Sequence, residues 1–181
     1  AAELLAQCEH DPHASVIAIS PNKNVLQTIQ KACHDQFSTL KRKEIITQAI
    51  NNSLLLHVDS PEQGLDAMND IASEHLVLLI DNPDTLRRQI KHAGSIFCGP
   101  YTPVALGDYA AGPNHVLPTG RAARFASPLS VMDFMKFSSH LTYSKDALTT
   151  IQQDIKTMTD IEHLDAHYHS VSIRLKNNTS T

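Results

Sequence analysis

The sequence lacks the features of membrane, secreted and nucleic-acid-binding proteins. It has no tryptophan, and its three cysteines, Cys8, Cys33 and Cys98, form no close pair. We therefore expect neither a disulfide framework nor a thiolate zinc site, and the expected compartment is a reducing cytoplasm. The longest apolar stretches, such as Leu76–Ile80, are far shorter than the roughly 20 residues that a bilayer requires. The net charge is −4, from 15 Lys and Arg against 19 Asp and Glu. We therefore expect no membrane or nucleic-acid partner.

Histidine is the residue type that stands out. The chain has 181 residues, of which 11 are histidine and 41% are hydrophobic. This length predicts one globular domain, or one plus a small appendage. Histidine is a common metal ligand and the usual acid or base at neutral pH, so the composition indicates a functional site. The chain begins at Ala1, in a pattern typical of a helix already under way. We therefore expect a processed chain or a piece of a longer protein.

Short apolar runs alternate with helical patterns over the first hundred residues. A Ser-Pro start at 20–21, a capping box at 60–63 and an Asn-Pro start at 82–83 each begin a helix, and Gly94 is a candidate C-terminal cap. The predicted strands are 16–19, 54–58, 76–80 and 95–98. This order predicts an α/β fold, a parallel sheet flanked by helices. We expect an incomplete Rossmann-like body, and no G-x-G-x-x-G fingerprint occurs in it.

The chain changes character after residue 98. Residues 99–120 are rich in glycine and proline, and a loop this long inside a compact domain is usually functional. Later segments predict a short helix at 131–137, helices at 144–158 and 161–175, and a disordered tail at 177–181. We predict two parts, an α/β body over residues 1–137 and a small helical appendage over 138–181.

Polar residues with chemical potential lie in four places. Gln7 and His10 are three residues apart and share a helix face, although a polar helix end is the plainer interpretation and Gln is a weak zinc ligand. Glu74 and His75 precede the predicted strand 76–80, whereas α/β sites normally lie beyond the carboxyl ends of strands. A solvated pair in a turn is therefore the plainer interpretation there.

The other two groups lie further along the chain. Asp108 and His115 share the long loop and can converge only if it folds back, the alternative being an Asx turn and a surface histidine. Glu162 and His167 lie five apart, ~140° around a helix, so they share no face unless the helix breaks between them. If the helix does not break, the plainer interpretation is that both residues belong to a solvated polar stretch. Taken together, the Gln, His, Asp and His side chains form a donor set without thiolates, which suits zinc.

The loop 107–119, Gly-Asp-Tyr-Ala-Ala-Gly-Pro-Asn-His-Val-Leu-Pro-Thr, closely resembles the signature loop of the histidinol dehydrogenase family. The segments 4–10, 71–76 and 162–167 resemble the same family in order and spacing. The resemblance covers essentially the whole chain but only the C-terminal part of the family's chains, less than half. Arg121 stands where a glycine is common, and Cys8 where an alanine is usual.

This resemblance implies a set of roles. Glu74 and His75 would be the catalytic pair, and Glu162 and His115 would contact the substrate. The zinc ion would be held by Gln7, His10, Asp108 and His167. These four residues and His75 would also contact the substrate. In this family the last ligand comes from the partner subunit of a homodimer, so His167 and Glu162 would serve the neighbouring site.

The resemblance also implies the reaction. The family oxidises L-histidinol to L-histidine through an enzyme-held aldehyde, with two NAD molecules, as the last step of histidine biosynthesis. His75 would accept a proton as hydride leaves, and Glu74 would activate water against the aldehyde. The NAD contacts are expected upstream of this chain. A zinc-binding, non-catalytic dimerising remnant is the alternative. A zinc hydrolase is a weaker one, which predicts turnover without NAD.

Overall fold

The computed structural model describes residues 1–176, so the tail predicted at 177–181 lies outside the described residues. The chain divides into two units, one from Ala1 to Phe134 and one that begins at Met135. The predicted boundary between 137 and 138 falls in a segment without helix or strand, 135–144. Each unit is described by itself below. No helix of the described part is both long and apolar enough to cross a membrane.

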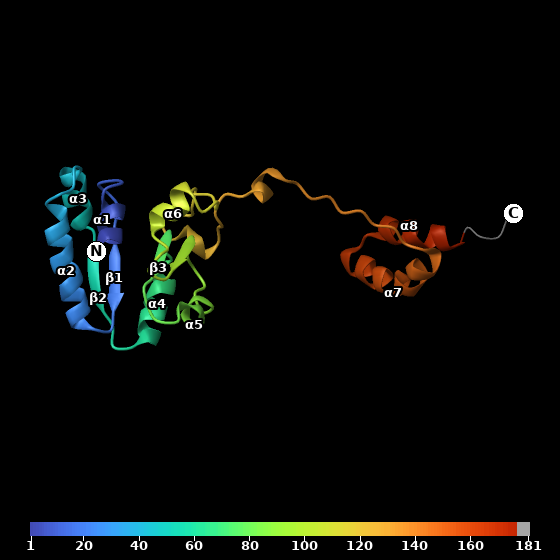
Figure 1. Ribbon diagram of the computed structural model, residues 1–181. Helices are drawn as coiled ribbons and strands as arrows, with labels where there is room; N and C mark the ends of the chain where they lie inside the picture. Colours follow the sequence, from blue (N-terminus) through green and yellow to red (C-terminus); the bar gives the residue numbers. More distant parts are fainter. Residues whose placement is uncertain (177–181) are drawn as a thin grey trace. The chain divides into compact units, whose positions relative to one another are not determined.

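The strands of the first unit pair in parallel, as predicted (Figure 1). The strand β1 (Ile17–Ser20) lies beside β2 (Leu54–His57), and β3 (His75–Leu78) lies beside β4 (Ser95–Cys98). The α/β class is therefore confirmed. Within the described residues, however, these strands form two two-stranded sheets and not one continuous sheet. Each strand has only four residues, so each ladder is short.

Helices flank both strand pairs. A buried cluster of Leu5, Cys8, Ile46 and Ala49 joins the first and third helices into a core. The predicted capping box is present in part: Ser60 Oγ accepts the N–H of Gln63 at 3.3 Å, whereas Gln63 Oε1 accepts the N–H of Asp59 at 2.6 Å instead of that of Ser60. The helices of this unit are α1 (Ala2–Cys8), α2 (Lys23–Phe37), α3 (Lys43–Ile50), α4 (Pro61–Ile71), α5 (Pro83–Arg87) and α6 (Val104–Tyr109).

The helix predicted from residue 82 to 94 is much shorter in the structure. It ends at Arg87 because Asn69 binds the following backbone: Asn69 Oδ1 accepts the N–H of Lys91 at 2.6 Å and that of His92 at 3.3 Å. Gly94 is therefore no helix cap, and that prediction is wrong. Its N–H donates instead to Ser73 O at 2.9 Å, at the entrance to β4. A tertiary contact has replaced the local helical pattern.

The long loop predicted at 99–120 contains the short helix α6. Thr102 Oγ1 donates to Cys98 O at 2.8 Å, which closes the turn after β4. The helix then begins at Val104, which is only 2% exposed. After the loop, the unit ends in two 3₁₀ turns, Ala122–Arg124 and Val131–Phe134, and the second replaces the helix predicted at 131–137.

The second unit contains two packed helices, α7 (Lys145–Glu162) and α8 (Asp165–Lys176). Ser144 caps α7 by accepting the N–H of Ala147 at 3.1 Å. The chain breaks at His163, which adopts a left-handed conformation with φ of 57°. Glu162 therefore ends one helix and His167 lies in the first turn of the next, so the helix break that their spacing requires is present.

Candidate functional site

The side chains of His75 and Asp108 lie together in the interior of the first unit. His75 is the first residue of β3, and Asp108 lies near the end of α6. His75 Nε2 is 3.7 Å from Asp108 Oδ1, and the two side chains are only 13% and 15% exposed. This separation is too long for a hydrogen bond. The structure thus brings Glu74–His75 and the glycine-rich loop to the same place.

The Nε2 atom of His75 is buried and has no hydrogen-bond partner among the described residues. Nearly all buried polar atoms in proteins are paired, so an unpaired one needs an explanation. A proton-transfer role or a bound ligand provides that explanation. The predicted pair is therefore not a solvated turn, although its position before a strand favoured that interpretation.

Phe97 and Gly107 hold this pair in place. The Phe97 ring on β4 lies against His75, with centroids 5.8 Å apart and planes at 47°. A Cβ on Gly107 would lie 2.6 Å from Cε1 of the same ring, so only glycine lets α6 approach β4 this closely. Gly107 precedes Asp108 directly. Neither role could be predicted from the sequence, because a lone Phe and a Gly in a glycine-rich segment give no distinctive signal.

Glu74 is fixed through its backbone. Its carbonyl oxygen accepts the N–H of Ser95 at 2.8 Å, and a Cβ on Gly94 would lie 2.5 Å from the same oxygen. The residue is half-buried and directly precedes His75. Glu74 therefore lies at the entrance to β3, with its backbone held against the start of β4.

Gln7 and His10 lie at the C-terminal end of α1. Gln7 is half-buried and His10 is exposed in the following turn, where its N–H donates to Gln7 O at 3.3 Å. Cys8 between them is buried, and this burial raises the pKa of its thiol. Cys8 is therefore a neutral core side chain and no thiolate ligand. A carboxylate oxygen of Glu3, in the same helix, accepts the N–H of Val104 at 3.0 Å and links α1 to α6.

The structure does not gather the remaining predicted residues. His115 is exposed, next to Asn114, whose Oδ1 accepts the N–H of Val116 at 2.8 Å in an Asx turn. Glu162 and His167 are exposed in the second unit. Within residues 1–176, no three His, Cys, Asp or Glu side chains group to hold a metal. The predicted set includes an amide and a partner's histidine, so its assembly stays a prediction.

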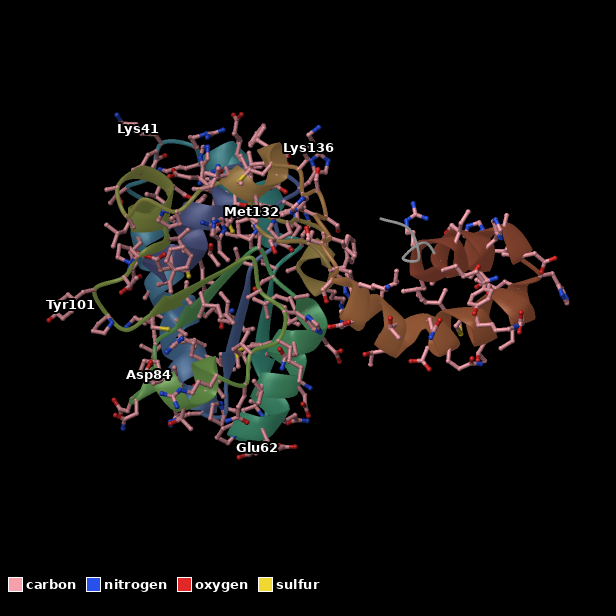
Figure 2. All side chains as sticks on the ribbon, turned by 90° about the vertical axis from the view of Figure 1, so that its right-hand side faces the viewer. Lys41, Glu62, Asp84, Tyr101, Met132 and Lys136 are labelled. Carbon is pink, nitrogen blue, oxygen red and sulfur yellow. The ribbon has the colours of Figure 1, made fainter. Side chains whose placement is uncertain are left out.

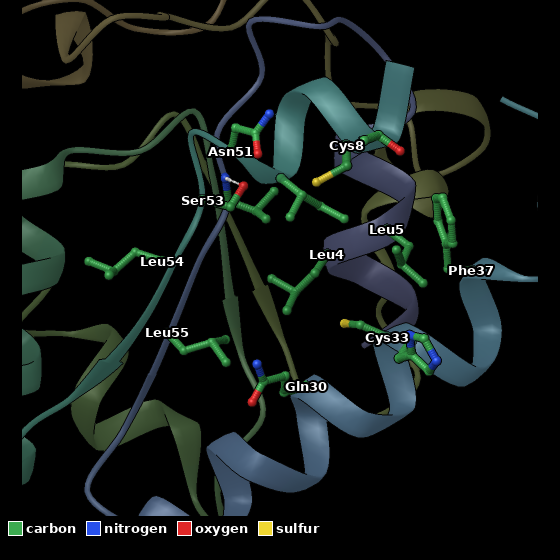
Figure 3. A pocket seen from close by; sticks show the side chains of 14 residues that line it. Leu4, Leu5, Cys8, Gln30, Cys33, Phe37, Asn51, Ser53, Leu54 and Leu55 are labelled. Carbon is green, nitrogen blue, oxygen red and sulfur yellow. Dashed lines mark hydrogen bonds between the residues drawn. The ribbon is translucent and has the colours of Figure 1, made fainter. Parts of the chain in front are cut away.

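A cavity of about 480 Å³ lies apart from this site, between α1, α2 and β2 (Figure 3). Neither His75 nor Asp108 lines it. Its walls are mainly apolar and include Leu4, Leu54 and Cys33. The lining also includes the polar side chains of Gln30, His34, Thr47, Asn51 and Ser53.

Comparisons with known proteins agree with the resemblance seen in the sequence. A model of the family described as histidinol dehydrogenase matches residues 1–175. The histidinol dehydrogenase of Caldanaerobacter subterraneus subsp. tengcongensis is 44% identical over 178 residues, 98% of this chain and 41% of that protein. That of Bacillus cereus is 47% identical over 177 residues, 97% of this chain and 41% of that protein.

A solved structure is similar as well. The crystal structure of histidinol dehydrogenase from Elizabethkingia anophelis matches 97% of this chain and 40% of its own, with a TM-score of 0.94 and 38% identity. The chain thus spans about two fifths of the length of these relatives. The chain therefore belongs to the histidinol dehydrogenase family.

Proposed function

We propose that this chain is the C-terminal part of a cytoplasmic histidinol dehydrogenase, which converts L-histidinol to L-histidine through histidinal with two NAD molecules, as the last step of histidine biosynthesis. Membership of the family supports the activity. The observation that carries the proposal is the buried, unpaired Nε2 of His75 beside Asp108, 3.7 Å away. A dehydrogenase of alcohols needs a base at such a protected position.

His75 acts as the base of the first oxidation. The substrate alcohol loses a hydride from carbon to the first NAD, and its hydroxyl proton passes to His75 Nε2, which gives the aldehyde and NADH. The nitrogen is available because no other group of the described chain binds it. Phe97 against the ring keeps it from turning away.

Glu74 acts in the second oxidation. Its carboxylate takes a proton from water as the water oxygen bonds to the aldehyde carbon. The anionic hydrate then gives a second hydride to the second NAD and its remaining hydroxyl proton to a base, and the product is the carboxylate. His115 contacts the substrate. We place the NAD contacts in the part of the protein outside this chain.

The donor set of the site fits zinc. Gln7, His10 and Asp108 of one subunit and the partner subunit's His167 would supply one amide oxygen, two imidazoles and one carboxylate, all of which are borderline or hard donors. When bound, zinc would orient the imidazole and amino nitrogens of the substrate. The partner subunit's Glu162 would contact the substrate.

A homodimer also accounts for an apolar segment that precedes α7. Val131 is 75% exposed, Phe134 80% and Phe137 76%, and Met132, labelled in Figure 2, is exposed as well. A run of exposed large apolar side chains marks a surface that another chain covers. A second copy of the protein is the occupant that the shared site requires.

The test is made on the protein at the length of its relatives, with a Glu74→Gln variant. We expect it to bind zinc and oxidise histidinol to histidinal, while oxidation of supplied histidinal falls by about 100-fold or more, because the general base is lost. Glu44→Gln, a change at an exposed first-turn glutamate of α3, is the control and leaves both rates unchanged.

Other outcomes count against the proposal. Equal aldehyde oxidation by wild type and Glu74→Gln would remove Glu74 from water activation. Zinc binding and dimerisation without any histidinol-dependent NADH would favour the non-catalytic remnant. Substrate turnover that needs no NAD would favour a hydrolase.

A further inference from the structure

One side-chain hydrogen bond joins α1 to α6. The N–H of Val104 donates to Glu3 Oε2 at 3.0 Å, across about a hundred residues of sequence. Glu3 lies in the first turn of α1, and Val104 is the first residue of α6. The two helices that carry Gln7 and Asp108 are thus directly connected.

The hydrogen bond satisfies a need of α6. The first N–H groups of a helix have no partner within it, and Val104 is 2% exposed, so water does not supply one. Pro103, the residue at the N-cap, makes no side-chain cap. No acidic residue lies in the first turn of α6. The Glu3 carboxylate therefore provides the cap and a favourable negative charge from another helix.

The spacing on the two helices is the same. Gln7 follows Glu3 by four residues in α1, and Asp108 follows Val104 by four residues in α6. Residues four apart lie one above the other on a helix face. The hydrogen bond between Glu3 and Val104 therefore lies one helical turn before Gln7 on α1 and one turn before Asp108 on α6.

We propose that Glu3 is a positioning residue, which sets the separation of Gln7 and His10 from Asp108 and so assembles the metal site. This inference rests on the proposed function, because it takes these residues as ligands. α6 has only six residues, and it is also held by the buried Val104 side chain and by the contact of Gly107 with Phe97. Without Glu3, the buried N–H of Val104 loses its partner, so we expect the start of α6 to shift and Asp108 to shift with it.

Zinc affinity tests the proposal without any use of activity. The protein at the length of its relatives is titrated with zinc in competition with a chelating dye, and unfolding curves check each variant. We expect Glu3→Ala to weaken zinc binding by about tenfold, as loss of a residue that orients a ligand does. Glu3→Gln keeps an acceptor oxygen and is expected to bind zinc nearly as tightly as wild type.

A matched control separates this role from a general effect on helices. Glu44 also lies in the first turn of its helix but is exposed, so Glu44→Ala is expected to leave zinc affinity unchanged. Amide hydrogen exchange at Val104 gives a second readout in the metal-free protein. We expect faster exchange in Glu3→Ala and protection in Glu3→Gln.

The outcomes distinguish the two proposals. If wild type binds zinc and Glu3→Ala binds it equally well, Glu3 has no positioning role and the proposed function stands. Equal loss in Glu3→Gln and Glu3→Ala, or in Glu44→Ala, would also overturn the role of the hydrogen bond. If wild type binds no zinc, the proposed metal site fails, and the positioning role fails with it.

Discussion

The environment of His75 depends on residues far from it in the sequence. Its ring lies against Phe97 from the next strand and faces Asp108 from α6. The sequence pattern favours a turn before a strand for Glu74 and His75, where side chains are usually solvated. The pattern of neighbouring residues could not predict the burial, because β4 and α6 create it. Only the resemblance to a family assigned the pair a catalytic role.

Arg121 carries local backbone strain. Its φ is 69°, in the left-handed region, where a residue with a side chain is disfavoured. We expect Arg121→Gly to raise the free energy of unfolding by about 1 kcal/mol, because glycine adopts this conformation without the clash of a Cβ. Denaturant unfolding measures the change.

The alanine variant is the control for Arg121. Arg121→Ala removes the charge but keeps the Cβ, so it is expected to gain no stability. A glycine variant no more stable than the alanine variant would show that the backbone there carries no strain worth relieving.

The elements of the fold were predicted where local signals decide them. The Ser60 cap begins α4, and the Ser144 cap begins α7. Prediction failed where distant groups decide. Asn69 ends the helix that begins at residue 83, and Glu3 caps α6. Neither effect has a signal within the segment that it shapes.

The close contact between α6 and β4 gives a prediction at Gly107. A methyl group there would meet the Phe97 ring at 2.6 Å, so Gly107→Ala forces a shift of either element. We expect a loss of about 1–3 kcal/mol in the free energy of unfolding, the usual cost of overpacking. Denaturant unfolding again provides the measurement.

A double-mutant cycle identifies Phe97 as the group that clashes. Phe97→Leu removes the ring atoms that the new methyl group meets, so the double variant is expected to lose less stability than the two single losses added together. Strictly additive losses would place the strain of Gly107→Ala somewhere other than the Phe97 contact.

On the scale of the whole molecule, the chain spans about two fifths of the length of its relatives. Two of the predicted metal-site residues, Gln7 and Asp108, are half-buried in the first unit, whereas His167 is exposed in the second. The four matched segments predicted the family, because their order and spacing are specific. A single chain cannot provide the contact between His167 and a neighbouring subunit, so this part of the site stays a prediction.

Complementation between two defective subunits tests the shared site most directly. Asp108→Asn removes a proposed zinc ligand from the site of its own subunit. His167→Ala removes the ligand that a subunit supplies to the site of its neighbour. Each variant alone is expected to be nearly inactive. Co-expressed at the length of the relatives, they form mixed dimers in which one site receives both Asp108 and His167. Random pairing of a symmetric dimer then restores about one quarter of the wild-type histidinol-dependent NADH formation.

The control for this measurement pairs Asp108→Asn with His10→Ala. In their mixed dimer, one site lacks Asp108 and the other lacks His10, so neither site is complete and no activity is expected to return. Recovery in the first pair and none in the second is the result that a site shared between subunits predicts. No recovery in either pair, with dimers present, would contradict it and return His167 to its own chain or remove it from the site.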